Sequence, residues 1–142
     1  MKMKKNYKIL GKYIKDISSE TPDIETYLFV KDQISKYQLD IEISSKPLKK
    51  QMIEIETQLK YSDKKESKKK SYFEINFATI IKIDDEIKEK KELEKIVLCD
   101  VQIEIYPDLE KSLLNLLHNS GYPNIKFEKK INFEELYNRR LN

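Results

Sequence analysis

Carboxylates are the residues in this sequence with the most scope for chemistry, since there are 25 Asp and Glu side chains against one histidine and one cysteine. Asp16 and Glu20 fall in the segment YIKDISSE, Tyr13 to Glu20, which reads as an extended strand. Alternate side chains of a strand share a face, so the two acids would point the same way, about 13 Å apart at roughly 3.3 Å per residue. The other acids lie opposite lysines on solvated strand faces, and no pair stands out as an acid/base couple.

The remaining residues that could do chemistry are isolated. His118 lies in a leucine-rich segment, where a packed or half-exposed histidine is the commoner outcome. Cys99 has no histidine near it in sequence, and most free cysteines pack as small apolar groups. The two glycines, Gly11 and Gly121, do not form a loop that could cradle a phosphate. We therefore expect no enzymatic activity, no metal site and no cofactor.

Length and composition predict one soluble domain. The 142 residues are enough for a single core, with 39% apolar and 37% charged side chains. The near balance of 28 basic and 25 acidic residues, a net charge of +3, argues against a dedicated nucleic-acid binder. We find no signal peptide and no apolar run of the roughly 20 residues that a membrane span needs. We expect a single cytoplasmic domain over residues 1–142, with 1–12 partly flexible.

Three segments alternate between apolar and polar residues, which is typical of strands with one buried and one solvated face. Between the second and third, residues 62–71 (SDKKESKKKS) are too polar to bury and predict an exposed lysine-rich hairpin loop. Together with the segment that contains Asp16, the three alternating segments predict a four-stranded antiparallel sheet. The apolar positions of the three segments are Leu39, Ile41 and Ile43; Ile53, Ile55, Leu59 and Tyr61; and Phe73, Ile75, Phe77, Ile81 and Ile83.

The lysine-rich loop leaves a second possibility open. It could contact nucleic acid or an anionic lipid surface. It contains no arginine, however, and its one aromatic neighbour is Tyr72, so base stacking has little to work with. We favour a solvated hairpin tip.

The last third of the chain changes to helical spacing. Pro107, followed by two acids, predicts a helix start, and Gly121 predicts its end. Asn132 and Glu135 resemble a capping box at the start of a second helix. Residues 93–106 fit either a strand or a helix. The apolar positions of the two helices are Leu109, Leu113, Leu116 and Leu117, then Phe133, Leu136, Tyr137 and Leu141.

Taken in order, these segments resemble the SecB family of protein-export chaperones. YIKDISSETP, Tyr13 to Pro22, matches the family signature of Tyr, x, Lys-Asp-Ile-Ser, x, Glu, x, Pro. Further matches follow in register along nearly the whole chain. They are Lys31-Asp32, Leu39-Asp40-Ile41, Tyr122-Pro123, Ile131-Asn132-Phe133 and Leu136-Tyr137.

The resemblance implies an α+β fold, a four-stranded antiparallel sheet with two C-terminal helices, assembled as a dimer of dimers. It implies an ATP-independent chaperone that binds unfolded secretory precursors in surface grooves and delivers them to the SecA ATPase. The resemblance assigns the acidic sheet face that meets SecA to Asp16, Glu20, Glu74 and Asn76. The resemblance assigns the client groove and the oligomer face to Leu39, Ile41, Phe73, Ile75, Phe77 and Tyr106.

Two alternatives stay open beside this resemblance. Phe73, Ile75 and Phe77 fit an ordinary sheet core covered by helices as well as they fit a groove. Gln33 stands where the family carries tryptophan, and Asn76 where it carries an acid. These two differences favour, as an alternative, a SecB-like chaperone dedicated to an antitoxin or another single client. We expect no nucleic-acid partner and no membrane insertion.

Overall fold

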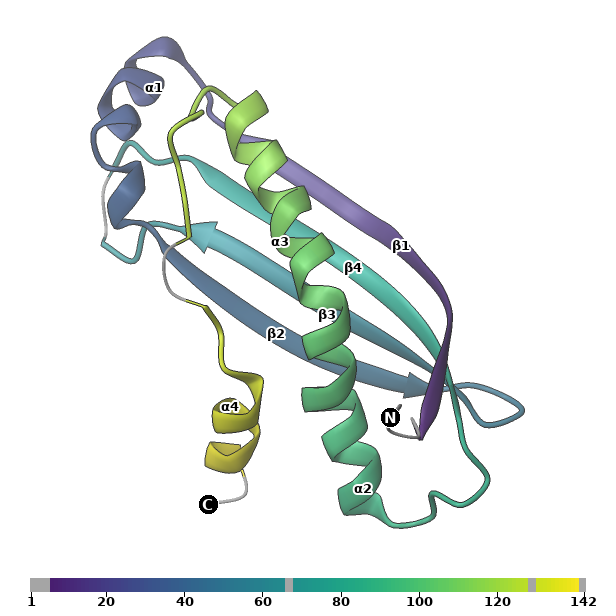
Figure 1. Ribbon diagram of the computed structural model, residues 1–142. Helices are drawn as coiled ribbons and strands as arrows, with labels where there is room; N and C mark the ends of the chain where they lie inside the picture. Colours follow the sequence, from purple (N-terminus) through teal and green to yellow (C-terminus); the bar gives the residue numbers. More distant parts are fainter. Residues whose placement is uncertain (1–5, 66–67, 128–129, 141–142) are drawn as a thin grey trace.

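The computed structural model describes residues 6–65, 68–127 and 130–140. For residue 140 it describes only the backbone. It consists of one antiparallel sheet, with a long helix crossing one face and shorter helices at its margins (Figure 1). The elements in chain order are β1 (Tyr7–Glu20), α1 (Ile24–Lys31), η1 (Ile34–Lys36), β2 (Gln38–Pro47), β3 (Met52–Ser62), β4 (Tyr72–Ile83), α2 (Lys90–Lys95), η2 (Ile96–Asp100), α3 (Val101–Asn119) and α4 (Phe133–Arg140).

The strands lie in the order β1-β4-β3-β2, and all neighbours are antiparallel. This confirms the predicted four-stranded sheet. β2, β3 and β4 form a meander, and β1 adds beside β4, so β1 and β2 are the two edge strands. Residues 7–12 belong to β1, although part of 1–12 was expected to be flexible; residues 1–5 lie outside the described residues.

The core lies between the inner face of the sheet and α3. Alternate residues of β3 and β4, such as Leu59 and Ile75, are fully buried. They meet the stripe of α3 that repeats at helical spacing, including Ile105, Leu109 and Leu113, each of which is also fully buried. The alternate residues of the strands and the apolar stripe of α3 therefore pack into one apolar layer, which supplies most of the burial in the fold.

Helical structure begins earlier than the sequence suggested. Residues 93–106 are helical throughout, because α2, a π-helical turn (η2) and α3 follow one another without a break. Pro107 lies inside α3 rather than at its start, so that prediction was wrong. A proline inside a helix costs about 3 kcal/mol. Here the buried stripe runs through Ile105 and Leu109 on both sides of it, and their burial offsets that cost.

A buried polar link joins the sheet to the π-helical turn. The Thr57 hydroxyl donates to Gln102 Oε1 (3.1 Å), and Gln102 Nε2 donates to the Val97 carbonyl oxygen (3.3 Å). Thr57 and Gln102 are both fully buried. Since a buried polar group without a partner is costly, the link fixes the register of this helical turn against β3.

α1 was not predicted. It begins at an ordinary cap, in which the Thr26 N–H donates to the Asp23 carboxylate (2.8 Å). Asp23 directly follows Pro22, a start signal that the sequence analysis did not use. Thr26 and Val30 are buried against the sheet, whereas the other apolar residues of the helix are largely exposed.

The lysines of the lysine-rich loop are exposed, whereas Ser62 and Asp63 at its start are half-buried and its end is buried. Ser71 is buried, with 1% of its surface exposed. Its N–H donates to Tyr37 Oη (3.1 Å), and its hydroxyl hydrogen-bonds Thr21 Oγ1 (2.7 Å) and Tyr122 Oη (3.2 Å). Ser71 therefore anchors the loop to three other parts of the chain. Residues 66–67 lie outside the described residues.

The predicted cap of α4 is confirmed, because the Glu135 N–H donates to Asn132 Oδ1 (3.0 Å). Phe133 and Tyr137 are buried as predicted. Leu136 is not, since 37% of its surface stays exposed. Leu141, also expected to pack, lies outside the described residues.

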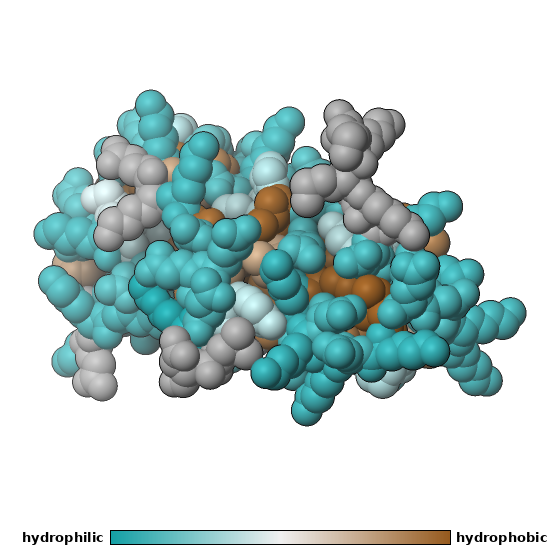
Figure 2. Space-filling model, turned by 60° about the horizontal axis from the view of Figure 1, so that its bottom comes forward, coloured by the Kyte–Doolittle hydropathy of each residue, from teal (hydrophilic) through white to brown (hydrophobic). Residues whose placement is uncertain are grey.

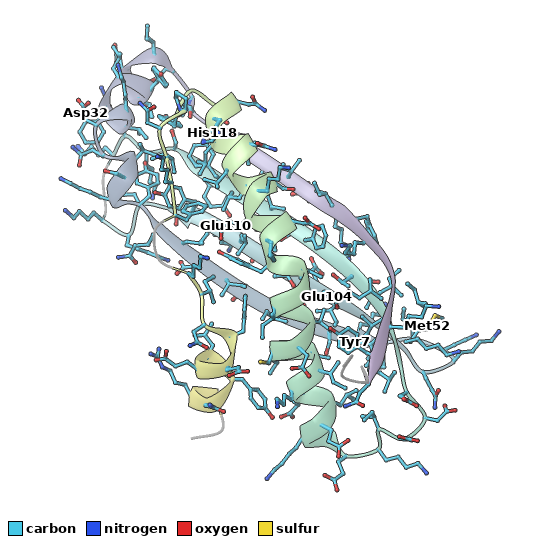
Figure 3. The ribbon with its side chains drawn as sticks, viewed as in Figure 1. Tyr7, Asp32, Met52, Glu104, Glu110 and His118 are labelled. Carbon is cyan, nitrogen blue, oxygen red and sulfur yellow. The ribbon has the colours of Figure 1, made fainter. Side chains whose placement is uncertain are left out.

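Both ends of α3 are held by tyrosines. At the first turn, Tyr7 Oη from β1 donates to Glu104 Oε2 (2.7 Å), and the two side chains point toward one another in Figure 3. Burial, and then this carboxylate, raise the pKa of Tyr7. At the other end, Tyr27 Oη donates to the Gly121 carbonyl (2.9 Å), directly after the helix stops. α1 and β1 are thereby tied to the central helix.

Replacement of Gly121 tests this contact. Gly121 has φ +107°, and an added Cβ would lie 2.6 Å from Tyr27 Cε1, so Gly121→Ala is both strained and crowded. We expect a fall of about 2 kcal/mol in the free energy of unfolding, measured by urea denaturation. Gly11→Ala is the control, because nothing lies within 4 Å of its added Cβ. We expect that control to stay within about 1 kcal/mol of the parent; equal losses in both variants would contradict the account.

Candidate functional site

A trench follows the inner side of the edge strand β2. It consists of three adjoining hollows of about 980, 730 and 550 Å³, and neighbouring hollows share lining residues. We call it the β2 trench and define it by Leu39, Ile41 and Ile43 on β2, with Leu98, Leu136 and Tyr137 opposite. Figure 2 shows apolar patches recessed among charged side chains on one face of the molecule.

The trench exists because α3 does not cover β2. The inner-face residues of β3 and β4 are buried, whereas those of β2 are only half-buried. α4 lies on the β2 side of the molecule (Figure 1), where Tyr137 Oη donates to the Lys91 carbonyl (3.3 Å). α4 therefore forms the far wall of the trench without closing it.

Aromatic rings form the floor of the widest hollow. The ring of Tyr61 lies 5.7 Å from Tyr37 and 5.3 Å from Phe127, measured between centroids. The hydroxyl of Tyr61 donates to the Ile34 carbonyl (2.7 Å), and burial raises the pKa of Tyr61 to about 12. Its polar atom is therefore satisfied. Tyr61 and Tyr37 are buried and support the hollow from beneath, and Phe127 is the partly exposed ring of the three.

Only part of the predicted groove set lines this trench. Leu39 and Ile41 line its widest hollow. Phe73 and Ile75 are fully buried, and Phe77 and Tyr106 are 7% exposed. These four residues pack in the core between the sheet and α3, so in this chain they cannot form an open groove. Tyr106 instead meets Phe133 at 5.3 Å between ring centroids.

The four residues predicted for a partner-facing surface do come together on the outer face of the sheet. The pairing of β1 with β4 places Asp16 opposite Asn76. Glu20 lies two cross-strand rows of this face further on, at the C-terminal end of β1. Glu74 lies between these rows, opposite Ser18. The side chains of Asp16 and Glu20 are exposed to solvent.

Neighbours already engage Glu74. Tyr72 Oη donates to Glu74 Oε2 (2.6 Å), and Gln58 Nε2 donates to the other carboxylate oxygen. Burial, and then this carboxylate, raise the pKa of Tyr72 to about 12. The Asn76 side-chain oxygen is buried without a hydrogen-bond partner among the described residues. Asp16 and Glu20 are thus the most accessible of the four residues.

Lys15 is a residue of this face that the sequence analysis missed. A β-bulge between Ile14 and Asp16 takes Lys15 out of the regular alternation. Its ammonium lies 3.1 Å from Glu54 Oε1 and 3.5 Å from Glu56 Oε2 on β3, and the hydrogen bond to Glu54 raises the pKa of Lys15. Strict alternation would have placed this lysine on the inner face.

Lys15 therefore divides the outer face by charge. Its ammonium partly offsets the two carboxylates of the middle rows, Glu54 and Glu56. The rows nearer α1 keep an excess of acids, which we call the acidic half. Its charged residues are Asp16, Glu20, Asp40, Glu42 and Glu74 against Lys60, and Asp40 is paired with Lys64 from the lysine-rich loop.

Isolated reactive side chains take structural roles. Cys99 is fully buried, and that burial raises the pKa of its thiol. His118 Nε2 lies 3.3 Å from the Ile125 carbonyl oxygen. Within residues 6–65, 68–127 and 130–140, no three His, Cys, Asp or Glu side chains form a group that could hold a metal ion. The described helices include none that is both long and apolar enough to cross a membrane.

Comparison with known proteins gives one consistent result. A family model described as preprotein translocase subunit SecB matches residues 1–142. A relative from Pelagibacter ubique (strain HTCC1062), provisionally named protein-export protein SecB, is 59% identical over 140 residues, which is 99% of this chain and 100% of the relative.

Solved structures agree on the fold. The Mycobacterium tuberculosis Rv1957 SecB-like chaperone, in complex with a ChAD peptide from the Rv1956 HigA1 antitoxin, matches with a TM-score of 0.65 at 10% identity, over 88% of this chain and 91% of that one. A Streptococcus agalactiae protein of unknown function matches with a TM-score of 0.48 at 8% identity, over 87% of this chain and 97% of that one, and supports no argument.

Proposed function

Because the chain belongs to the SecB family of preprotein translocase subunits, whose members are protein-export chaperones, we propose that it holds unfolded secretory precursors without ATP and delivers them to the SecA motor. The cytoplasm is the compartment where such precursors would be met. The observation that carries the proposal is the β2 trench, an open apolar surface beside an edge strand.

A trench of this kind suits clients of unrelated sequence. Apolar burial is non-directional, contributing about 25 cal/mol per Å², so it does not require a specific side-chain pattern. The unpaired backbone groups of an edge strand can bond any extended segment. Ordering costs leave each short contact weak, so several contacts along one client are needed for retention.

Release would not use the chain's own chemistry. The two glycines do not form a phosphate-binding loop, so nucleotide-driven ejection has no evident site. We propose instead that a client leaves by folding or by transfer to a partner. Transfer needs a second surface that clients leave free, and the acidic half lies on the opposite face of the sheet from α3.

Substitution in the trench tests client holding. Ile41→Lys places a charge on its apolar wall, and we expect client affinity to fall about tenfold because one buried aliphatic contact is lost. The readout is light scattering from a refolding, slow-folding protein without ATP. Ile24→Lys is the control, since Ile24 is 73% exposed on α1, outside the trench. Full suppression of aggregation by the Ile41→Lys protein would count against the trench.

Delivery to SecA is assigned to the acidic half. Family resemblance puts the zinc-bearing tail of SecA against this face, and Asp16 and Glu20 are its most accessible carboxylates. We expect the double variant Asp16→Lys and Glu20→Lys to lose binding to that tail in calorimetry while it still suppresses aggregation. A matched control reverses two other exposed acids, Glu92 and Glu134. Retained binding by the first variant would exclude the acidic half as the docking site.

Assembly is assigned to the β1 edge. Four apolar side chains along this 14-residue edge strand stay 44–47% exposed: Leu10, Tyr13, Ile14 and Ile17. A long apolar edge of this kind is unfavourable in water unless another chain covers it. We propose that a second copy does so, as one step in forming the tetramer that the family implies.

Gel filtration tests this assembly. Four chains of 17.0 kDa should elute near 68 kDa (4 × 17.0). We expect Ile14→Glu with Ile17→Glu to elute at half that mass or less, because the charges face the proposed partner strand. Ile24→Glu should behave as the parent does. A parent protein that elutes as a monomer at micromolar concentration would refute the assembly.

Neither alternative displaces this proposal. A chaperone dedicated to one client fits the structural neighbour, which holds an antitoxin peptide, but 10% identity extends only to the fold. A pull-down that recovers one small protein rather than SecA would favour it. The nucleic-acid or lipid role of the lysine-rich loop has no support from the family or its named relative.

A further inference from the structure

The widest hollow of the β2 trench has a cationic rim. Three basic side chains line it: Lys126, Lys130 and Arg139. Among the described residues of its lining the one acid is Glu135, and that carboxylate pairs with Arg139 at 2.5 Å. Within the described part of the chain, Lys126 and Lys130 form no ion pair, and both side chains are exposed.

This rim is a local feature rather than a result of the lysine-rich composition. The 730 Å³ hollow next to it shares Arg139, and the other two charged residues that border it, Glu42 and Glu56, belong to the outer face of the sheet. The 550 Å³ hollow at the far end carries one charge of each sign, Lys90 and Glu94. Once the Arg139–Glu135 pair is set aside, the widest hollow is the one of the three whose described lining residues carry more basic than acidic side chains.

An extended client segment would meet floor and rim at once. Alternate side chains of a strand point to opposite sides, so one residue enters the hollow while its two neighbours stay at the margin. The floor offers the partly exposed side chains of Leu39, Ile41 and Phe127 above the buried rings of Tyr37 and Tyr61, which suits an aromatic or aliphatic side chain. The margin carries Lys126 and Lys130, which attract carboxylates and repel lysines.

We propose that this end of the trench selects client segments in which an aromatic or aliphatic residue is flanked by acidic residues. The inference rests on the proposed holding of unfolded clients and adds a preference to it. The holding surface is apolar, and the rim decides which apolar segments are retained longest.

Three peptides of about ten residues test the preference. They share one central Leu-x-Phe-x-Leu pattern and differ only in the flanking and intervening residues, which are Glu, Gln or Lys. Fluorescence anisotropy at low salt gives each Kd. We expect the Glu peptide to bind roughly three- to tenfold more tightly than the Lys peptide, because exposed pairs are individually weak. The difference should shrink at high salt.

Charge reversal locates the effect. Lys126→Glu with Lys130→Glu should abolish or invert the preference, with binding of the Gln peptide nearly unchanged. The control, Lys88→Glu with Lys111→Glu, reverses two exposed lysines outside the trench lining and should keep the preference. Equal Kd values for the three peptides, or a preference that survives reversal of the rim, overturn the charge selection and leave client holding in place. Failure of all three peptides to bind overturns both.

Discussion

One helix cannot cover four strands. An α-helix is about 10 Å wide with its side chains, whereas four strands spaced about 4.8 Å apart span roughly 14 Å between the outer strand axes alone. α3 crosses the sheet over its central strands, so β3 and β4 are sealed on their inner face. The inner sides of both edge strands remain partly exposed. The β2 trench and the apolar β1 edge are two results of the same incomplete cover.

The sequence was most informative where one pattern had one structural solution. Period-2 alternation located β2, β3 and β4, and Asn132 located the start of α4. It was least informative where tertiary packing overrode a local signal. Pro107 marks helix starts in general, but the apolar stripe of α3 continues through it. Residues 97–106 alternate like a strand and also repeat like a helix, and only packing against the sheet decides between them.

The candidate surfaces show the same limit. Alternation predicted that Phe73, Ile75 and Phe77 share a face, but whether that face is open or covered depends on the path of α3, which no local pattern encodes. The family resemblance placed Asp16 and Glu20 correctly on one face. The bulge that turns Lys15 onto that face could not be predicted, because a one-residue irregularity leaves no mark in hydropathy. Two of the three rim residues, Lys126 and Lys130, come from the segment that joins α3 and α4, where sequence periodicity is absent.

Ser71 gives the lysine-rich hairpin a practical value for studying this protein. It is held by hydrogen bonds to Thr21, Tyr37 and Tyr122, whereas the lysines before it face solvent. Lengthening a surface connection adds little entropy cost when its ends are already fixed. An epitope or a fluorophore carrier could therefore be inserted between β3 and Ser71 with little disturbance of the sheet. That site would report on the molecule from a point outside the trench and beside the acidic half, where Lys64 of the loop pairs with Asp40.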